Sequence, residues 1–420
     1  MNSFDVIVIG AGASGLIAAS TAAKTGKSVC LLEKKSRPAI KLSITGKGRC
    51  NITNSANIKE FISEFGQNGK FLYGAFNKFF SSDILTLLEQ YGVETKLERG
   101  GRYFPCCDDA NAVVNALIKY AKDNNVKIKT SSPVKNIAKN SNKIKEIVLE
   151  NGEFFQAQNY ILATGGLSYP NTGSTGDGYK FAKQLGHTII SQSPALVPIV
   201  INSPYLKQLN GLKLKNVEIT VFANNKEITK IFGDMEWTIF GATGPIVLNI
   251  SSLIYKLLSE KKEVFLSLNL KPALTKEVLD KRLIRELNNF GSITVKNMLK
   301  ELLPVQMIDV FMKYAKINLT KKCSAVNKEE RLNYLTALTD MKFSVTSTRS
   351  INEAIITKGG VCIDEVEQKT MKSKLIDNLY FCGEILDLDA PTGGFNLQAA
   401  FSTGYLAGIS VSASVMPFRR

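Results

Sequence analysis

The sequence predicts a doubly wound α/β fold that carries an inserted small β-barrel and a helical subdomain. Strand-like and helix-like segments alternate through residues 1–190 and return in residues 351–420, which is typical of a doubly wound sheet. Period-two alternation at Val217–Phe222 indicates a barrel-like insert, assigned to residues 191–270 and 335–350, and the apolar spacing becomes helical over 271–334. The two ends of the chain are therefore expected to form one discontinuous domain.

A glycine-rich turn joins the first strand to the first helix. The apolar run Phe4–Ile9 predicts a buried parallel strand, and an Ala-rich helix follows from about Ser14 to Lys24. In such a turn Gly10 permits the sharp bend, Gly12 lets the backbone approach a pyrophosphate, and Gly15 lets the helix pack against the strand. The expected phosphate contacts are Gly10, Gly12, Ala13, Ser14 and Gly15.

A second strand, Ser28 to Leu32, ends at Glu33. A carboxylate at this distance from the glycine turn accepts hydrogen bonds from an adenosine ribose. An isolated glycine pattern is weak evidence, but a strand before it, a helix after it and this acid together favour dinucleotide binding. The alternative is a glycine-rich turn without a ligand.

The elements that follow are assigned from periodicity and turn residues. A hairpin is expected to turn at Asn151-Gly152, and a separate buried strand is expected to begin at Tyr160 and end in the tight turn Thr164-Gly165-Gly166. The other expected elements of this part are helices at 82–91 and 111–122, a strand at 126–129, and hairpin strands at 143–149 and 153–158.

The middle of the chain has a different pattern. Val217–Phe222 alternates at period two, Asn224-Asn225 marks a turn, and Glu227–Phe232 follows as a second strand. Leucines recur at helical spacing between Thr275 and Lys316, with Pro304 separating two helices. Near the C-terminus we expect a strand at 379–383 and a helix rich in small residues at 396–408.

Further glycine-containing stretches point to the cofactor. The segment from Lys41 to Asn54 has the composition of a phosphate-clasping loop, with Arg49 as a charge-assisted donor. It lacks the glycine and the Ser or Thr that a P-loop requires, and a solvated surface loop is the alternative. Glu384 is placed to hold ribityl or phosphate-side hydroxyls, and the turn before Asn396 offers N–H groups to the electron-rich edge of a flavin. This order of motifs favours FAD over NAD as the tightly held cofactor.

These motifs resemble those of the bacterial FAD-binding oxidoreductases that include BaiN-like reductases and aminoacetone oxidase-like flavoproteins. The resemblance covers essentially the whole chain and is most specific from Gly383 to Gly404. It implies an FAD domain of the two-dinucleotide-binding type, a small β-barrel and a helical insert. Family members usually carry a glycine where Lys47 stands, which leaves FAD binding intact. The expected cofactor contacts are Gly10, Gly12, Ala13, Ser14, Gly15, Glu33, Lys34, Lys41, Gly46, Arg49, Cys50, Asn51, Val134, Ala163, Thr164, Gly165, Gly383, Glu384, Gly394, Asn396, Leu397 and Gln398.

The composition excludes several classes of protein. The chain has 420 residues, of which 44% are hydrophobic and 21% charged, an ordinary globular composition. No apolar run approaches the roughly 18 to 20 residues that cross a bilayer, and the N-terminus lacks the features of a signal peptide, so we expect a cytoplasmic protein. Seven cysteines without CxxC spacing and a single histidine provide no ordinary zinc or iron–sulfur ligand set, and no metal is expected.

The formal net charge of +16 raises the question of a nucleic-acid partner. The basic residues are mostly lysines spread singly along the chain, without a run of five and without interleaved aromatic residues. A general Lys- and Asn-rich composition explains the charge at least as well. We therefore expect a small-molecule substrate and no membrane partner, with nucleic acid as the alternative.

Several residues invite a functional role that the sequence does not support. His187 is the only histidine, and we favour a structural hydrogen-bonding role over acid–base chemistry. Cys50 could be a redox thiol, but packing is favoured because no second cysteine is close in sequence. Tyr169 could reach a flavin or serve equally well as a core or lid aromatic. No catalytic residue is assigned.

The predicted function is FAD-dependent oxidoreduction. A hydride is expected to move between flavin N5 and a small organic substrate, with NADH or NADPH in one half-reaction. A reductase and an amine oxidase are both compatible with the sequence. The alternatives are a flavin-containing protein that modifies or binds nucleic acid, such as tRNA, and a non-catalytic flavin-binding protein.

Overall fold

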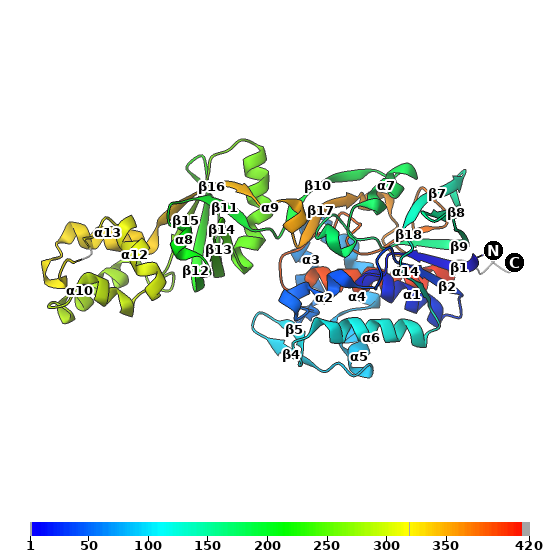
Figure 1. Ribbon diagram of the computed structural model, residues 1–420, viewed down its shortest axis with the longest axis horizontal. Helices are drawn as coiled ribbons and strands as arrows, with labels where there is room; N and C mark the ends of the chain where they lie inside the picture. The colour runs from blue at the N-terminus through cyan, green and yellow to red at the C-terminus, as the bar shows by residue number, and fades with distance from the viewer. Residues whose placement is uncertain (1, 319, 414–420) are drawn as a thin grey trace. The chain divides into compact units, whose positions relative to one another are not determined.

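The structure, a computed structural model, describes residues 2–318 and 320–413. The chain divides into two compact units. One unit comprises Met1–Pro194 and Ala354–Arg420, and the other comprises Ala195–Glu353 (Figure 1). None of the described helices is long and apolar enough to cross a membrane.

The first unit is built around a seven-stranded sheet with the order β6-β2-β1-β9-β8-β7, and β18 also pairs with β9. The strands β6, β2, β1, β9 and β18 are parallel, whereas β7 and β8 form an antiparallel extension. The bounds are β1 Asn2–Ile9, β2 Val29–Leu32, β6 Lys127–Lys129, β7 Val134–Asn140, β8 Lys143–Leu149, β9 Phe154–Leu162 and β18 Leu379–Phe381. The predicted doubly wound α/β class is confirmed.

Four parallel strands of this sheet end in one row. Ile9 of β1 pairs with Leu32 of β2 and with Leu162 of β9, and Phe381 of β18 also pairs with Leu162. In an open α/β sheet, ligands bind beyond the carboxyl ends of the strands. The loops that follow these four residues therefore define the edge where a ligand is expected.

One prediction for this sheet was wrong. Residues 153–158 and the segment from Tyr160 are not two strands but the single strand β9. Phe155 in its first half pairs with β8, and the same strand runs alongside β1 from Phe155 to Leu162. The polar residues Gln156 and Asn159 stay extended because both occupy paired positions in the ladder with β1.

Two helices from opposite ends of the chain pack together on this sheet: α1 (Ala13–Lys24) and α14 (Phe395–Ala413). Glycines make the close approach possible. A Cβ atom on Gly404 would lie 2.4 Å from the Ser14 carbonyl oxygen, and one on Gly408 would lie 2.6 Å from that of Ala18. Both helices are rich in small residues, which is why the sequence pattern placed the C-terminal helix correctly but could not name its partner.

The remaining helices and two small sheets complete the first unit. They include a three-stranded sheet in the order β3-β5-β4 and a two-stranded sheet of β10 and β17. Their bounds are α2 Ile40–Ser43, β3 Thr53–Asn54, α3 Ile58–Glu64, α4 Tyr73–Lys78, α5 Ser81–Gln90, β4 Thr95–Glu98, β5 Arg102–Pro105, α6 Ala110–Asp123, α7 Asp177–Gln184, β10 Ile189–Ala195 and β17 Ile356–Val361.

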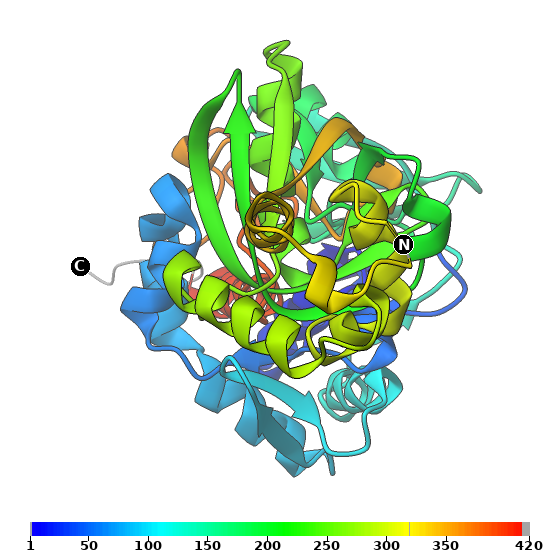
Figure 2. The same cartoon turned by 90° about the vertical axis from the view of Figure 1, so that its left-hand side faces the viewer.

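The second unit contains a closed barrel in the order β11-β14-β13-β12-β15-β16, whose strands curve strongly (Figure 2). Trp237 and Phe343 pack edge to face, with ring centroids 4.8 Å apart. The bounds are β11 Ile199–Asn202, β12 Lys213–Ala223, β13 Lys226–Thr238, β14 Gly241–Thr243, β15 Val264–Asn269 and β16 Met341–Thr348.

Helices lie between β13 and β16 in the sequence of this unit. The predicted leucine stripe is confirmed as core, since Leu279, Leu283 and Leu287 of α10 are buried. The longer helices are α9 Pro245–Ser259, α10 Lys276–Asn289, α12 Val305–Tyr314 and α13 Lys328–Thr339.

Candidate functional site

The three glycines of the first turn have three different surroundings. Gly10 has φ +101°, and a Cβ atom there would lie 2.5 Å from the Ala163 carbonyl oxygen. A Cβ atom on Gly15 would lie 1.9 Å from the carbonyl oxygen of Gly10. Around Gly12, by contrast, no described atom beyond its two chain neighbours lies within 4 Å of that position. The turn is closed at Gly10 and Gly15 and open at Gly12, which is where a pyrophosphate approaches the backbone.

The start of α1 can receive an anion. Gly12 is its N-cap, and no described side chain caps the helix there or places a negative charge in its first turn. The first N–H groups of a helix lack intrahelical partners, and the positive end of the helix dipole favours phosphate.

Glu33 lies beside this turn at the carboxyl end of β2. Its Oε2 accepts a hydrogen bond from the Ala11 N–H at 2.9 Å and its Oε1 accepts from the Lys35 N–H at 2.8 Å. The remaining lone pairs of a carboxylate can accept ribose hydroxyls. The open position at Gly12, the uncapped helix and this carboxylate fit the pyrophosphate and ribose of a dinucleotide such as FAD.

A second glycine turn precedes α14. Gly393 and Gly394 have φ +148° and +98°, and a Cβ atom on Gly394 would lie 2.5 Å from the Thr53 carbonyl. The Asn54 side chain donates to the Gly393 carbonyl at 2.9 Å. The Asn51 side chain, with its amide oxygen turned towards the loop, accepts from the Gly394 N–H at 3.0 Å. The predicted loop and the predicted helix start are therefore held together.

Two residues near this turn, both predicted to contact the cofactor, have side chains that form hydrogen bonds within the protein. Asn396 donates to the Ala390 carbonyl at 2.7 Å and accepts from the Ala390 N–H at 2.9 Å. Gln398 is fully buried and accepts from the Thr53 hydroxyl at 2.7 Å. These side chains shape the turn, so a contact with the cofactor from this region would have to come from the backbone. Leu397 between them is partly buried.

A network of polar side chains surrounds Glu384. Its Oε2 accepts from Lys41 Nζ at 2.6 Å, and its Oε1 accepts from the Ser168 hydroxyl and the Thr357 N–H, both at 2.9 Å. The predicted residue Lys34 forms an ion pair with Asp177 at 2.7 Å. The structure thus brings Lys41 and Glu384 together and pairs Lys34 elsewhere.

Arg49, the predicted phosphate donor, forms ion pairs within the protein. Its guanidinium donates to Glu98 and, at 2.6 Å, to Asp108, and it stacks over the Phe104 ring at 4.2 Å. Two carboxylates therefore compensate the charge that was expected to bind a phosphate. Gly46 in the same loop supplies a φ of +59°, a conformation that favours glycine.

The remaining predicted contacts follow the ends of the strands. Ala163 donates its N–H to the Ile9 carbonyl at 2.9 Å, and Gly165 continues the turn with φ +71°. The Thr164 hydroxyl is buried without a hydrogen-bond partner among the described residues. A Cβ atom on Gly383 would lie 2.4 Å from the Ser14 hydroxyl oxygen. Val134 lies at the start of β7 and is partly buried.

Cys50 is completely buried, and burial raises its pKa to about 12. A thiol reacts through its thiolate, so we expect Cys50 to be inert as a redox group. Treating the folded protein with iodoacetamide at pH 8 should label the exposed Cys106 and Cys107 and leave Cys50 and Cys382 unmodified, as peptide mass spectrometry can show. Rapid labelling of Cys50 in the folded state would contradict this.

Sequence reasoning missed Asp389. It lies in the loop between β18 and α14, at the ligand edge of the sheet, and its side chain is 23% exposed. Burial raises the pKa of Asp389, and the charge of the neighbouring Asp387 raises it further. The ammonium group of Lys358, at 3.7 Å, lowers the pKa and so opposes both effects. Such a carboxyl group can hold a proton closer to neutral pH than an exposed aspartate does. The only signal in the sequence was its position between the two glycine motifs of the C-terminal segment.

His187 is buried in a hydrogen-bonded chain. The Ser373 hydroxyl oxygen accepts from the N–H groups of Leu375 and Ile376. Its proton is therefore free to be donated to His187 Nε2 at 2.9 Å, and His187 Nδ1 donates to Glu365 at 3.1 Å. This arrangement is compatible with the predicted structural role.

We expect His187 to make the stability of the protein depend on pH. Burial lowers its pKa from 6.5, against the opposing effect of Glu365. The unfolded chain therefore binds a proton that the folded protein does not, and the free energy of unfolding should fall as the pH drops below about 6.5. Urea unfolding between pH 7 and 5 should show this loss, and His187→Gln should flatten it. An unchanged slope in the variant would assign the pH dependence to other groups.

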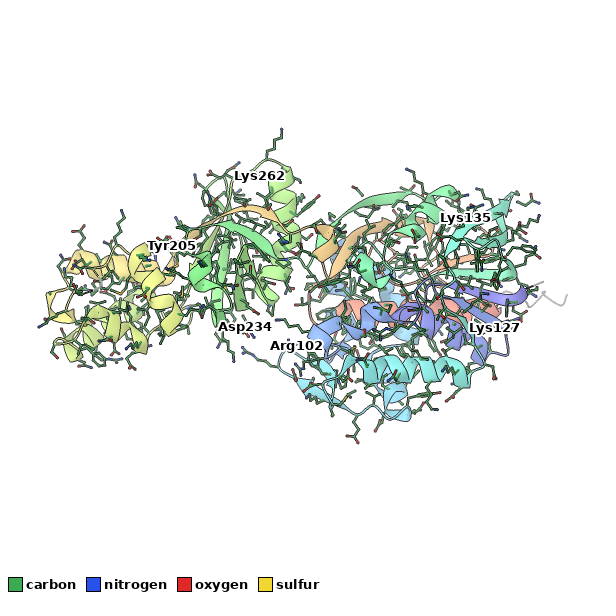
Figure 3. The ribbon with its side chains drawn as sticks, viewed as in Figure 1. Arg102, Lys127, Lys135, Tyr205, Asp234 and Lys262 are labelled. Carbon is green, nitrogen blue, oxygen red and sulfur yellow. The ribbon has the colours of Figure 1, made fainter. Side chains whose placement is uncertain are left out.

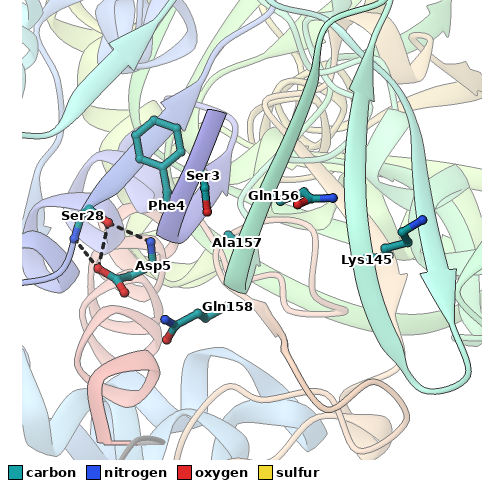
Figure 4. A pocket seen from close by; sticks show the side chains of 8 residues that line it. All are labelled: Ser3, Phe4, Asp5, Ser28, Lys145, Gln156, Ala157 and Gln158. Carbon is teal, nitrogen blue, oxygen red and sulfur yellow. Dashed lines mark hydrogen bonds between the residues drawn. The ribbon is translucent and has the colours of Figure 1, made fainter. Parts of the chain in front are cut away.

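One cavity of about 460 Å³ lies at the opposite edge of the sheet (Figure 4). It is lined by residues near the amino ends of β1 and β9, including Phe4 and Gln156, and by Ser28 just before β2. Ser28 donates its N–H to Asp5 at 2.8 Å. Because ligands of this fold bind beyond the carboxyl ends, this cavity is not the candidate site.

Comparisons with known proteins agree with this geometry. The family described as HI0933-like protein Rossmann domain matches residues 4–410. The ribosomal RNA dihydrouridine synthase of Escherichia coli (strain K12) is 30% identical over 405 residues, covering 96% of this chain and 97% of that protein. The 3-dehydro-bile acid delta(4,6)-reductase of Clostridium scindens is 29% identical over 403 residues, covering 96% and 97%.

Two solved structures share the fold. The open conformation of a flavocytochrome c3 fumarate reductase matches with a TM-score of 0.55 and 17% identity, covering 98% of this chain and 78% of that chain. The 3-ketosteroid-delta4-(5alpha)-dehydrogenase from Rhodococcus jostii RHA1 matches with a TM-score of 0.53 and 14% identity, covering 98% and 97%.

Fold, relatives and site together define the protein as an FAD-binding oxidoreductase. When bound, FAD supplies hydride transfer, which no protein side chain provides. Because the family match spans residues 4–410, the chain belongs to the HI0933-like family, and the resemblance drawn from its motifs is confirmed.

Proposed function

We propose that the protein is a reductase that uses FAD to saturate a carbon–carbon double bond conjugated to a carbonyl group. Dihydrouridine is uridine whose C5–C6 double bond, conjugated to the C4 carbonyl, has been reduced. A delta(4,6)-reductase of a 3-dehydro-bile acid reduces double bonds conjugated to the 3-oxo group. The two relatives therefore have names that describe one kind of chemistry, and this common chemistry favours reduction over amine oxidation.

The substrate we propose is a uridine in RNA. The observation that carries this choice is the net charge of +16 in a chain that is 30% identical, over nearly its whole length, to a protein named for ribosomal RNA. A polyanionic substrate gains affinity from such a charge. In the sequence analysis, nucleic acid is the alternative partner. The leading expectation there is a small molecule, because the lysines are spread singly along the chain.

Different residues of the chain would bind the cofactor and protonate the substrate. Gly12, the N–H groups at the start of α1, and Glu33 would hold the pyrophosphate and ribose of FAD. The backbone of the turn before α14 would hold the other end of the cofactor. Asp389 would donate a proton to the substrate carbon next to the carbonyl. NADH or NADPH would be the reductant.

The direct test is product formation. FAD-loaded protein is incubated without oxygen with unmodified ribosomal RNA and either NADH or NADPH, and dihydrouridine is measured by mass spectrometry of the digested nucleosides. We expect dihydrouridine at a defined position with at least one reductant. If the flavin is reduced but no dihydrouridine forms, RNA is not the substrate.

A steroid-like enone is the second candidate, favoured by the bile-acid reductase relative. Under the same anaerobic conditions a 3-oxo-Δ4 steroid should then reoxidise the reduced protein, whereas ribosomal RNA should not. Reoxidation by oxygen alone, with neither acceptor active, would contradict both candidates.

A further inference from the structure

The basic charge of this chain is not evenly compensated. Lysines project from the surface of both units, as Lys127, Lys135 and Lys262 do in Figure 3. The unit Ala195–Glu353 carries 23 Lys and Arg residues against 15 Asp and Glu residues. Such a surplus is ordinarily solvated and carries no information about a site. A partly buried cation next to a second cation is more informative about a binding site, because burial and charge repulsion both cost free energy.

Lys271 and Arg282 form such a pair. Lys271 follows β15 in a turn in which its N–H donates to Asn269 at 2.9 Å and its carbonyl accepts from the Leu274 N–H at 3.1 Å. The backbone position of Lys271 is therefore fixed. Burial lowers the pKa of Lys271, and the charge of Arg282 lowers it further. The two side chains are thus within electrostatic range of each other and partly shielded from solvent.

The Arg282 side chain has an unused donor. Its Nε is buried and has no hydrogen-bond partner among the described residues. Glu286 approaches it only to 3.8 Å, which is too long for a hydrogen bond, and Glu286 instead accepts from Arg285 at 3.0 Å. An unsatisfied guanidinium N–H costs free energy. The Arg282 side chain as a whole is 35% exposed, so an anion in solvent can reach the rest of the guanidinium.

The other nearby acid is already in use. Asp280, on the same helix as Arg282, accepts from Arg331 of α13 at 2.8 and 3.3 Å. The middle of α10 and the turn before this helix therefore hold more cations than the two carboxylates neutralise. The phosphodiester group of a nucleic acid carries one negative charge and two non-bridging oxygens, which could accept from the Lys271 ammonium and the Arg282 guanidinium at the same time.

We propose that Lys271 and Arg282 bind a phosphate group of the RNA substrate; this inference rests on the proposed function. The site lies within the second unit and is distinct from the residues that hold the pyrophosphate of FAD. It would add affinity and position the RNA without taking part in the reduction.

The test measures RNA binding by the FAD-loaded, full-length protein. A fluorescent ribosomal RNA fragment is titrated by anisotropy at several salt concentrations. Lys271→Gln and Arg282→Gln should each weaken binding by about 10-fold and each reduce the salt slope by about 1, as expected for a lost phosphate contact. Lys281→Gln is the matched control, because it removes an equal charge from an exposed position next to Arg282, and it should change affinity by less than about 2-fold.

Folding and cofactor controls separate a binding role from a structural one. The FAD content and melting temperature of the three variants should match those of the parent protein. NADPH and inorganic phosphate serve as competitors: if the variants lose NADPH affinity but keep RNA affinity, the phosphate is that of the dinucleotide and the RNA assignment is overturned.

The two proposals fail differently. If the parent protein does not bind RNA in a salt-dependent manner, the RNA function itself is wrong. If the parent binds RNA but Lys271→Gln and Arg282→Gln behave like Lys281→Gln, only the phosphate site is wrong.

Discussion

Replacing Gly12 with aspartate is expected to abolish FAD binding without unfolding the protein. Gly12 has φ −80° and ψ −169°, an extended conformation open to any residue, and it is the N-cap of α1. Aspartate is a preferred N-cap, so the stability of the apoprotein should stay the same or rise by about 1 kcal/mol or less. The same carboxylate would occupy the open space at the turn and repel a pyrophosphate, lowering affinity by about 100-fold or more.

Asparagine at the same position is the control. It caps a helix about as well as aspartate does but carries no charge, so Gly12→Asn should retain more FAD than Gly12→Asp. Flavin absorbance after reconstitution gives the occupancy, and thermal unfolding of the apoproteins gives their stability. Normal FAD content in Gly12→Asp would show that the pyrophosphate does not lie at this turn.

Replacing Asp389 with asparagine is expected to separate the two half-reactions. Reduction of the bound flavin by NADH, NADPH or dithionite needs no proton from Asp389 and should keep its rate. Transfer to the unsaturated acceptor should slow by about 100-fold or more, because general acid catalysis contributes about 10² to 10⁴. Stopped-flow absorbance follows both half-reactions, and equal slowing of both would indicate a positioning role instead.

The pH profile provides a second readout. Asp387, whose side chain accepts from Asn68 at 3.1 Å, contributes to the raised pKa of Asp389. Removing its charge with Asp387→Asn should lower the pKa of Asp389, so the protonated form is lost at a lower pH. The alkaline limb of the oxidative half-reaction should therefore move to lower pH while its plateau is retained. A profile that does not move would argue against Asp389 as the acid.

The backbone part of the site could be predicted from the sequence, because each glycine there answers a local steric requirement. Gly10 and Gly15 have no room for a Cβ atom and Gly12 has room that no described residue uses. Side-chain roles could not be predicted in this way. Arg49 is neutralised by Glu98 and Asp108, which are 49 and 59 residues away, and a motif does not reveal such partners.

Asp389 is a second side chain whose properties could not be predicted from the sequence. In the sequence Asp387 and Asp389 look equivalent, two acids flanking a leucine. The fold gives Asp387 an amide donor from Asn68 and gives Asp389 a more distant lysine. Burial and the charge of Asp387 raise the pKa of Asp389, and both are properties of the tertiary structure.

The packing of α14 on α1 has a consequence for how the protein is made. The helix α14, which completes the nucleotide-binding half, leaves the ribosome about 370 residues after its partner α1. Until α14 has emerged, the nascent α1 lacks the helix whose Gly404 and Gly408 pack against it. Stable capture of the flavin must therefore wait until α14 has been synthesised, and truncations within α14 should yield colourless, aggregation-prone protein.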